Sequence, residues 1–224
     1  MKKFFVIAAM MVAAVSANAQ FEPGTFSIQP KLGGVGSMLS NTPNLRLGDN
    51  VKLDKTAVGG VLIGAEAEYQ LTNMFSLAAG ANYSMQGSAW EDENIYIEGL
   101  KYEIKDTKIE LGYINVPVVV NAYLFRGFAV KTGVQFGFLT SAKMKSTVSG
   151  KNDSMTQSIN YDEDFKDDCK KFDVSIPVGV SYQFKVPIVI DARYNIGLSN
   201  VNKDSDLKCK NQVFQITVGY KFKL

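Results

Sequence analysis

The side chains that could carry chemistry in this chain are few, and the most telling absence is histidine, of which the 224 residues contain none. A Ser-His-Asp triad and a histidine-ligated metal site are therefore impossible. Glu66 and Glu68 lie two residues apart, so they share one face of an extended segment and could act as an acid and base pair. Charges on such a face more often pair with each other. Of the functions considered, an enzyme is the least favoured.

A second group of candidates lies in polar segments of the chain. The acidic run from Asp162 to Asp168 could bind Ca²⁺ through carboxylate oxygens, but it lacks the spacing and the glycine of a dedicated calcium loop. A solvated loop is the favoured interpretation, and no metal or cofactor is predicted. Four aromatic residues in polar segments could contact a protein partner or pack against their own segments: Trp90, Tyr96, Tyr102 and Tyr161.

The first residues have the layout of a secretory signal peptide. Lys2 and Lys3 precede an apolar run from Phe4 to Val15, and Ala17-Asn18-Ala19 forms a small-x-small cleavage pattern. The apolar run is shorter than the roughly 20 residues that span a membrane as a helix. We therefore predict a cleaved signal peptide over residues 1–19 and one mature domain over residues 20–224.

The charge of the chain excludes one class of partner. Of the 24 basic residues, Lys2 and Lys3 would leave with the signal peptide, and the remaining 22 equal the 22 acidic residues. A nucleic-acid partner needs a basic footprint, so none is expected.

Apolar and polar side chains alternate strictly along much of the chain, and this pattern indicates the elements that position the residues named above. Such a period of two predicts strands with one apolar and one polar face. Eight segments show it: 26–33, 61–70, 75–86, 114–124, 128–138, 172–184, 188–199 and 214–222. Most of the apolar rows extend over roughly 9–13 residues, which suits a tilted membrane strand. The number is even, as in single-chain outer-membrane barrels.

The connections between these segments also alternate. Three are short, at residues 71–74, 125–127 and 185–187, and four are long and polar, at about residues 40–56, 87–107, 142–171 and 200–211. Short periplasmic turns alternating with long extracellular loops are typical of a membrane barrel. We predict an all-β fold, an eight-stranded antiparallel up-and-down transmembrane β-barrel. Residues 108–112 break the apolar phase that begins at Ile114, which indicates either a bulge near Tyr113 or a strand that continues beyond the membrane.

The apolar row is assigned to lipid and the polar row to the barrel interior. The polar row is rich in small residues, which suits a crowded interior of eight strands, whereas a soluble lipocalin-like barrel would need a more charged exterior. Buried charges must be paired. We therefore predict an interior charge network that holds the barrel closed: Lys31, Glu66, Glu68, Lys131, Asp191 and Arg193.

Several short motifs resemble the outer-membrane β-barrel porin family, in particular its PorT-like group, with the small-barrel architecture of OmpX-type proteins. They include Pro30-Lys31-Leu32-Gly33-Gly34, Asn115-Val116-Pro117, Asp191-Ala192-Arg193-Tyr194-Asn195 and the terminal Gly219-Tyr220-Lys221-Phe222. The resemblance implies the outer membrane of a Gram-negative bacterium as the location. It also implies a connection with protein secretion or surface organisation, without transferring a role to any residue.

Three functions from different classes remain. The first is a non-enzymatic structural or partner-binding barrel with long extracellular loops, the second a channel for small solutes, and the third an outer-membrane enzyme. Side chains fill an eight-stranded interior, which disfavours the channel. The expected contacts are outer-membrane lipid, the barrel assembly machinery and a surface protein, and the barrel is expected to be a monomer.

Two cysteines, Cys169 and Cys209, complete the set of reactive side chains. An even number in an exported chain is compatible with a disulfide. Both residues fall in long connections on the same side of the predicted barrel, each shortly before a strand. We therefore expect a disulfide between them, provided that the two loops lean together to within about 4.4–6.8 Å between Cα atoms. Two free thiols are the alternative.

Overall fold

Eight long strands form the body of the molecule in the computed structural model, which describes residues 22–40, 45–47, 51–97, 100–152, 155–203 and 208–224. The predicted signal peptide lies outside the described residues. The eight strands are β1 (Phe26–Ser40), β5 (Val58–Gln70), β6 (Phe75–Trp90), β8 (Leu100–Phe125), β9 (Phe128–Asn152), β11 (Phe172–Gln183), β12 (Ile188–Gly197) and β13 (Lys210–Tyr220). The described part of the chain contains no helix long and apolar enough to cross a membrane.

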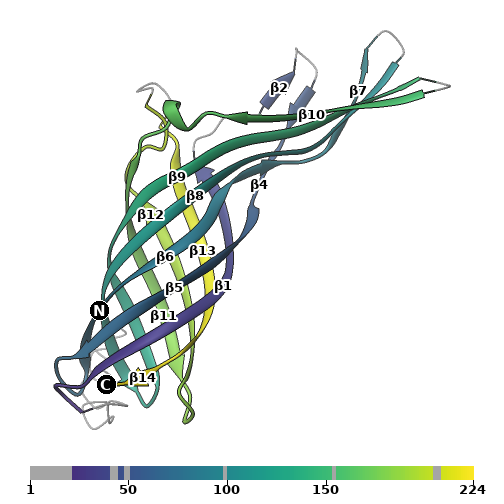
Figure 1. The fold of residues 1–224 in the computed structure, drawn as a ribbon. Coiled ribbons are helices and arrows are strands. Elements are labelled where there is room, and N and C mark those ends of the chain that lie inside the picture. The colour runs from purple at the N-terminus through teal and green to yellow at the C-terminus, as the bar shows by residue number, and fades with distance from the viewer. Residues whose placement is uncertain (1–21, 41–44, 48–50, 98–99, 153–154, 204–207) are drawn as a thin grey trace, which may run out of the picture.

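Antiparallel neighbours close these strands into a ring (Figure 1). The order is β1-β5-β6-β8-β9-β11-β12-β13, and β13 returns to β1 through ten residue pairs from Lys31–Gly219 to Ser40–Lys210. Each strand pairs with the next barrel strand in the chain, so the topology is up-and-down. The predicted eight-stranded antiparallel barrel is confirmed.

The two faces of the strands are distributed as the alternation predicted. Leu32 on the apolar row of β1 is 66% exposed, whereas the neighbouring Lys31 is buried. The same contrast recurs around the ring, where most of the Val, Ile, Phe and Tyr side chains point outward and most of the Ser, Asn, Gln and charged side chains point inward. A belt of apolar side chains around a polar interior is the arrangement of a membrane barrel rather than of a soluble one.

The short connections lie at one end of the barrel. Arg126 and Gly127 join β8 to β9, and Gly127 has a φ of 80°, a left-handed conformation that glycine adopts without a steric penalty. Stacked rings of Phe125 and Phe128 flank this turn, with centroids 4.6 Å apart. The short strand β14 (Phe222–Lys223) pairs with the start of β1 at the same end.

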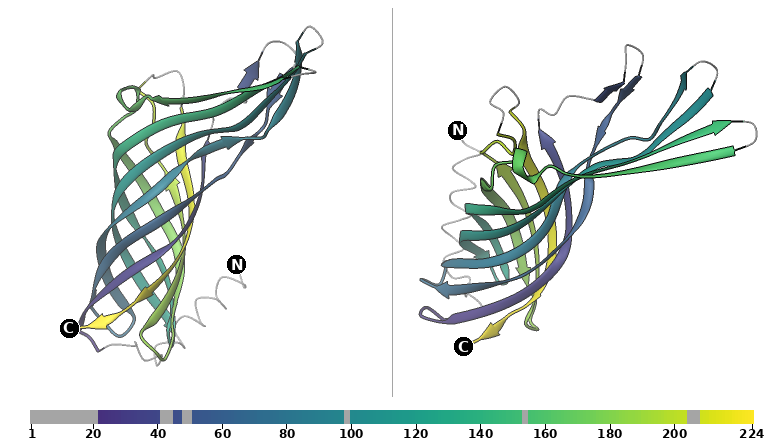
Figure 2. Two further views of the ribbon diagram at one scale, coloured as in Figure 1. Left: turned by 45° about the vertical axis from the view of Figure 1, so that its right-hand side comes forward. Right: turned by 45° about the horizontal axis from the view of Figure 1, so that its top comes forward.

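At the opposite end a β-sheet arm leans away from the barrel (Figures 1 and 2). We define the arm as the strand segments beyond the barrel, 87–110 and 143–164. They comprise the ends of β6, β8 and β9 together with β7 (Glu93–Ile97) and β10 (Met155–Asp164). The strands β8 and β9 are 26 and 25 residues long and pair along nearly their whole length. The sequence interpretation of residues 87–107 and 142–171 as mainly loops was therefore wrong.

The irregularity near Tyr113 has both of the causes considered from the sequence. The pairing of β8 with β9 shifts register between Gly112 and Tyr113, and the strand also continues past this bulge into the arm. A second shift between Lys105 and Lys108 surrounds Asp106, a non-glycine residue with a φ of 54°. The bulges bend the ladder, which is how a barrel strand can leave the barrel and enter the arm.

Smaller elements lie at the same end as the arm. They are the hairpin of β2 (Leu45–Leu47) and β3 (Val51–Leu53), the strand β4 (Lys55–Thr56) and the 3₁₀ turn η2 (Lys166–Asp168). Beneath η2 a small apolar cluster fills the barrel mouth and includes Leu39, Leu111, Tyr113, Leu139 and Cys169.

Candidate functional site

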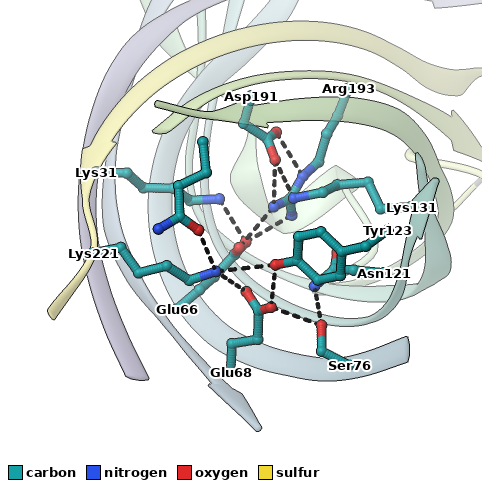
Figure 3. A network of polar contacts seen from close by, with 11 residues as sticks. Lys31, Glu66, Glu68, Ser76, Asn121, Tyr123, Lys131, Asp191, Arg193 and Lys221 are labelled. Atoms are coloured by element: carbon teal, nitrogen blue, oxygen red, sulfur yellow. Dashed lines mark hydrogen bonds and ion pairs between the residues drawn. The ribbon is translucent and has the colours of Figure 1, made fainter. Parts of the chain in front are cut away.

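The first candidate site is the charge cluster in the barrel interior (Figure 3). Glu66 of β5 lies at its centre. The Arg193 guanidinium of β12 donates two parallel hydrogen bonds to the Glu66 carboxylate, each of 2.6 Å, and Lys31 Nζ of β1 donates a third of 2.5 Å. A carboxylate held in this bidentate way has little freedom to rotate.

A second carboxylate extends the cluster to the far wall. Arg193 Nε lies 2.8 Å from Asp191 Oδ1 and Lys131 of β9 forms a salt bridge with Asp191. Residues from β1, β5, β12 and β9 are thus connected across the lumen. Because β5 and β12 are separated by β13 and β1 in the ring, the Glu66–Arg193 contact spans the interior.

A neighbouring group surrounds Glu68. Its carboxylate forms a salt bridge with Lys221 at 2.7 Å and accepts hydrogen bonds from the Tyr123 hydroxyl at 2.5 Å and from Ser76 at 2.7 Å. Asn121 donates to Ser76 at 2.9 Å, which connects β8 to β6. All of these side chains are buried.

The structure brings together the six residues assigned to the network from the sequence, but in two groups. Five of them connect through Glu66 and Asp191. Glu68 instead pairs with Lys221, which was not among the residues assigned to the network. Tyr123, Ser76 and Asn121 were also missed. The alternation carried a signal for them, since all three lie on the inward row.

The ion pairs and hydrogen bonds of this cluster connect the strands across the interior and stabilise the closed barrel. Glu66 and Glu68 share a face as expected, yet each is enclosed by its own cations and hydrogen-bond donors. A proton-transfer role requires a carboxyl group within reach of a substrate, and these are buried among protein groups. Within the described ranges, no three His, Cys, Asp or Glu side chains are arranged to hold a metal ion, and that includes the acidic run 162–168.

The second candidate site is the arm, whose two faces differ in character. On one face Glu110 accepts from Lys108 at 2.9 Å and from Lys145 at 2.7 Å, and Lys143 lies 3.5 Å from Asp162. Hydrogen bonds from Lys108 and Lys145 lower the pKa of Glu110. This face is therefore lined by a row of ion pairs.

The other face is partly apolar. Trp90 is only 5% exposed and packs with Ile104, Ile109 and Val148. At the edge of this face lies the outer strand β10, where Ile159 is 57% exposed and Tyr161 is 56% exposed. Of the four aromatics considered as partner contacts, Tyr161 is therefore exposed and Trp90 is not. Tyr102 is half-buried, and the side chain of Tyr96 lies outside the described part.

The predicted disulfide is not formed in this structure: Cys169 and Cys209, both within the described ranges, are buried but not bonded to each other. The reason is the backbone between them. Cys169 forms a β-bridge with Asn202, and Val201 N–H donates to Cys209 O at 2.8 Å. The cysteines are therefore about two strand spacings apart, roughly 10 Å, beyond the reach of a disulfide. Burial raises the pKa of the Cys169 thiol to about 11.

Comparison with known proteins places the chain among barrels. The model of the family "Outer membrane protein beta-barrel domain" matches residues 18–203. No curated protein matches the sequence.

Solved structures with a similar arrangement include Ail, the attachment invasion locus protein of Yersinia pestis, and Neisserial surface protein A. Ail has 15% identity and a TM-score of 0.42, covering 89% of this chain and 99% of its own. For Neisserial surface protein A the identity is 13% and the TM-score 0.43, with 89% and 97% covered. The toluene transporter TodX of P. putida is also similar, at 11% identity and a TM-score of 0.32, covering 94% of this chain and 74% of its own.

Proposed function

The chain belongs to the family of outer membrane protein β-barrel domains, and from that premise we propose that it is a closed anchor which presents its arm to a protein at the cell surface. The observation that carries this proposal is the combination of an arm built from strands of 26 and 25 residues with an interior crossed by ion pairs. A strand needs only about 9–11 residues to span the membrane, so more than half of each of these strands serves another purpose.

The interior supports an anchor rather than a pore. Eight strands enclose a space that side chains can fill, and here Arg193, 1% exposed, bridges Glu66 and Asp191 within it. Opening a conducting path would require these charges to separate in a poorly hydrated space, which is costly. The alternative function, a channel for small solutes, needs such a path.

We also propose how the chain reaches the outer membrane and which kind of system its surface partner belongs to. The signal peptide over residues 1–19 is proposed to be removed on export, which leaves Gln20 as the first residue. The PorT-like resemblance suggests that the surface partner belongs to a secretion or surface-organisation system. The partner on the barrel itself is lipid, contacted by the outward apolar row.

Labelling of intact cells tests the orientation on which the proposal rests. Glu93→Cys places a thiol on the exposed arm and Asn73→Cys places one in an exposed short turn. A membrane-impermeant maleimide is expected to label Glu93→Cys on intact cells, and Asn73→Cys only after the outer membrane is permeabilised. Labelling of Asn73→Cys alone on intact cells would contradict the proposal.

A further inference from the structure

The outer strand of the arm, β10, has an open edge. It pairs with β9 through ten residue pairs from Met155–Asn152 to Asp164–Lys143, and in the described part of the chain no other strand pairs with it. An exposed edge of this length is a ready template for another strand. Natural edges are usually shortened, covered or charged, and the central part of β10 is none of these.

The backbone groups that face the open edge can be identified. Phe165, the next residue after β10, donates its N–H to Ala142 O on the β9 side at 3.1 Å. Because backbone groups alternate in direction along a strand, those of Tyr161 and Ile159 also point toward β9. The N–H and C=O groups of Ser158, Asn160 and Asp162 therefore point outward, away from the sheet.

We propose that β10 pairs with the β10 strand of a second copy of this chain, antiparallel and centred on Asn160. This inference deepens the proposed function, because it names a partner for the arm, and it replaces the monomer that the sequence led us to expect. The register is set by the two-fold symmetry, which places Asn160 opposite itself, Ser158 opposite Asp162 and Ile159 opposite Tyr161. The outward backbone groups of Asn160, Ser158 and Asp162 are those that such a pair would hydrogen-bond.

The side chains of β10 are complementary in this register. On the apolar face, Ile159 meets Tyr161 of the other copy twice, and pairs of aromatic and β-branched residues are favourable across strands. Both residues are more than half exposed in the single chain. On the polar face, the Ser158 hydroxyl can donate to the Asp162 carboxylate.

Charge selects the antiparallel arrangement. The acidic residues Asp162, Glu163 and Asp164 occupy one end of β10, and Ser158 to Tyr161 are uncharged. A parallel pair would place the acidic ends side by side, and like charges directly opposite are destabilising. The antiparallel pair places each acidic end beside an uncharged stretch.

The orientation of the arm permits two copies in one membrane to pair. Figure 1 views the barrel from its side and shows the outer part of the arm nearly edge-on. In the right panel of Figure 2, where the top of the molecule comes forward, the strands of the arm are seen separately. The sheet of the arm thus lies across the barrel axis. A two-fold axis along the membrane normal then leaves both barrels in the same membrane with their arms side by side.

Disulfide trapping tests the register. In Asn160→Cys the two new cysteines lie directly opposite each other. Their Cα atoms are then about 5.5 Å apart, the separation of a hydrogen-bonded residue pair in an antiparallel sheet. In Asp164→Cys each thiol lies opposite residue 156, so the two thiols are eight residues or about 26 Å apart. Mild oxidation of outer membranes is expected to give covalent dimer with Asn160→Cys but not with Asp164→Cys or wild type. Equal trapping of both variants, or of neither, would overturn the proposal.

Proline substitution tests the same edge without added thiols. Asn160→Pro removes an outward N–H and leaves the pairing with β9 intact, whereas Asn160→Ala keeps that N–H; both lose the hydrogen bond from Thr147. Dimer measured by light scattering in detergent is expected to be lost in Asn160→Pro and kept in Asn160→Ala, with both barrels showing heat-modifiable migration. A monomeric wild type would overturn the dimer, while surface labelling of Glu93→Cys separately tests the proposed function.

Discussion

Removing Glu66 is expected to destabilise the barrel more than removing the arginine that it binds. The cluster holds four cations, Lys31, Lys131, Arg193 and Lys221, and three carboxylates, Glu66, Glu68 and Asp191. Glu66→Gln leaves four buried cations with two carboxylates. Leaving a buried charge uncompensated costs about 3–5 kcal/mol, which is the expected loss in unfolding free energy.

The arginine variant removes more contacts but leaves the charges balanced. In Arg193→Gln, Glu66 keeps Lys31, Asp191 keeps Lys131 and Glu68 keeps Lys221, so three cations face three carboxylates. The variant then loses only the hydrogen bonds that Arg193 donates to charged groups, and the amide of the new glutamine replaces some of them. The expected loss in unfolding free energy is about 2 kcal/mol.

Urea titration of the purified barrel in lipid vesicles, followed by far-UV circular dichroism, measures both losses. Glu66→Gln is expected to have the lower unfolding free energy of the two variants. If Arg193→Gln is destabilised as much as Glu66→Gln or more, charge balance does not govern the stability of the cluster, and the reasoning fails.

Three further predictions concern the lipid face, the thiols and the arm. Val134→Arg places a charge on the outward row and should cost about 2–4 kcal/mol in vesicles, more than Gln135→Arg on the inward row; the reverse order would show that the faces are misassigned. Denatured protein without reductant should alkylate at both Cys169 and Cys209, and a mass with no added label would show a disulfide. The pKa of Glu110 is lower in the folded arm than in the unfolded chain. Glu110 therefore stabilises the arm at pH values above its pKa in the unfolded chain, and this stabilisation is lost as the pH falls through its pKa in the folded arm. Protection of the arm amides, measured as the exchange rate relative to the intrinsic rate at the same pH, should therefore fall below about pH 4 in wild type, and Glu110→Gln should remove this fall in protection.

The barrel was predictable because alternation is a strong signal where one face meets lipid and the other meets a polar interior. Leu32 and Lys31 illustrate the contrast, which recurs in all eight strands. The same alternation predicted the charged residues of the interior cluster, because they lie on the polar rows of the strands. Lys221 lies just after β13, and its pairing with Glu68 depends on the ring closing β1 between β13 and β5, which no local pattern reveals.

The arm was not predictable by the same reasoning. Both of its faces meet water over much of their length, so residues such as Lys145, Thr147 and Ser149 show no apolar alternation and resemble a loop. Their strands are held by continuation of the β8–β9 ladder from the barrel, a non-local cause. The cysteine pairing failed for a similar reason, because the chain at Val201 and Asn202 passes between the two residues.

The central claim, a closed anchor, is tested most directly by single-channel recording of the purified wild-type protein in a planar lipid bilayer. With Arg193 bridging Glu66 and Asp191 inside the barrel, we expect no stable conductance steps of porin size. Reproducible large steps from a homogeneous, folded sample would contradict the account and favour a solute channel.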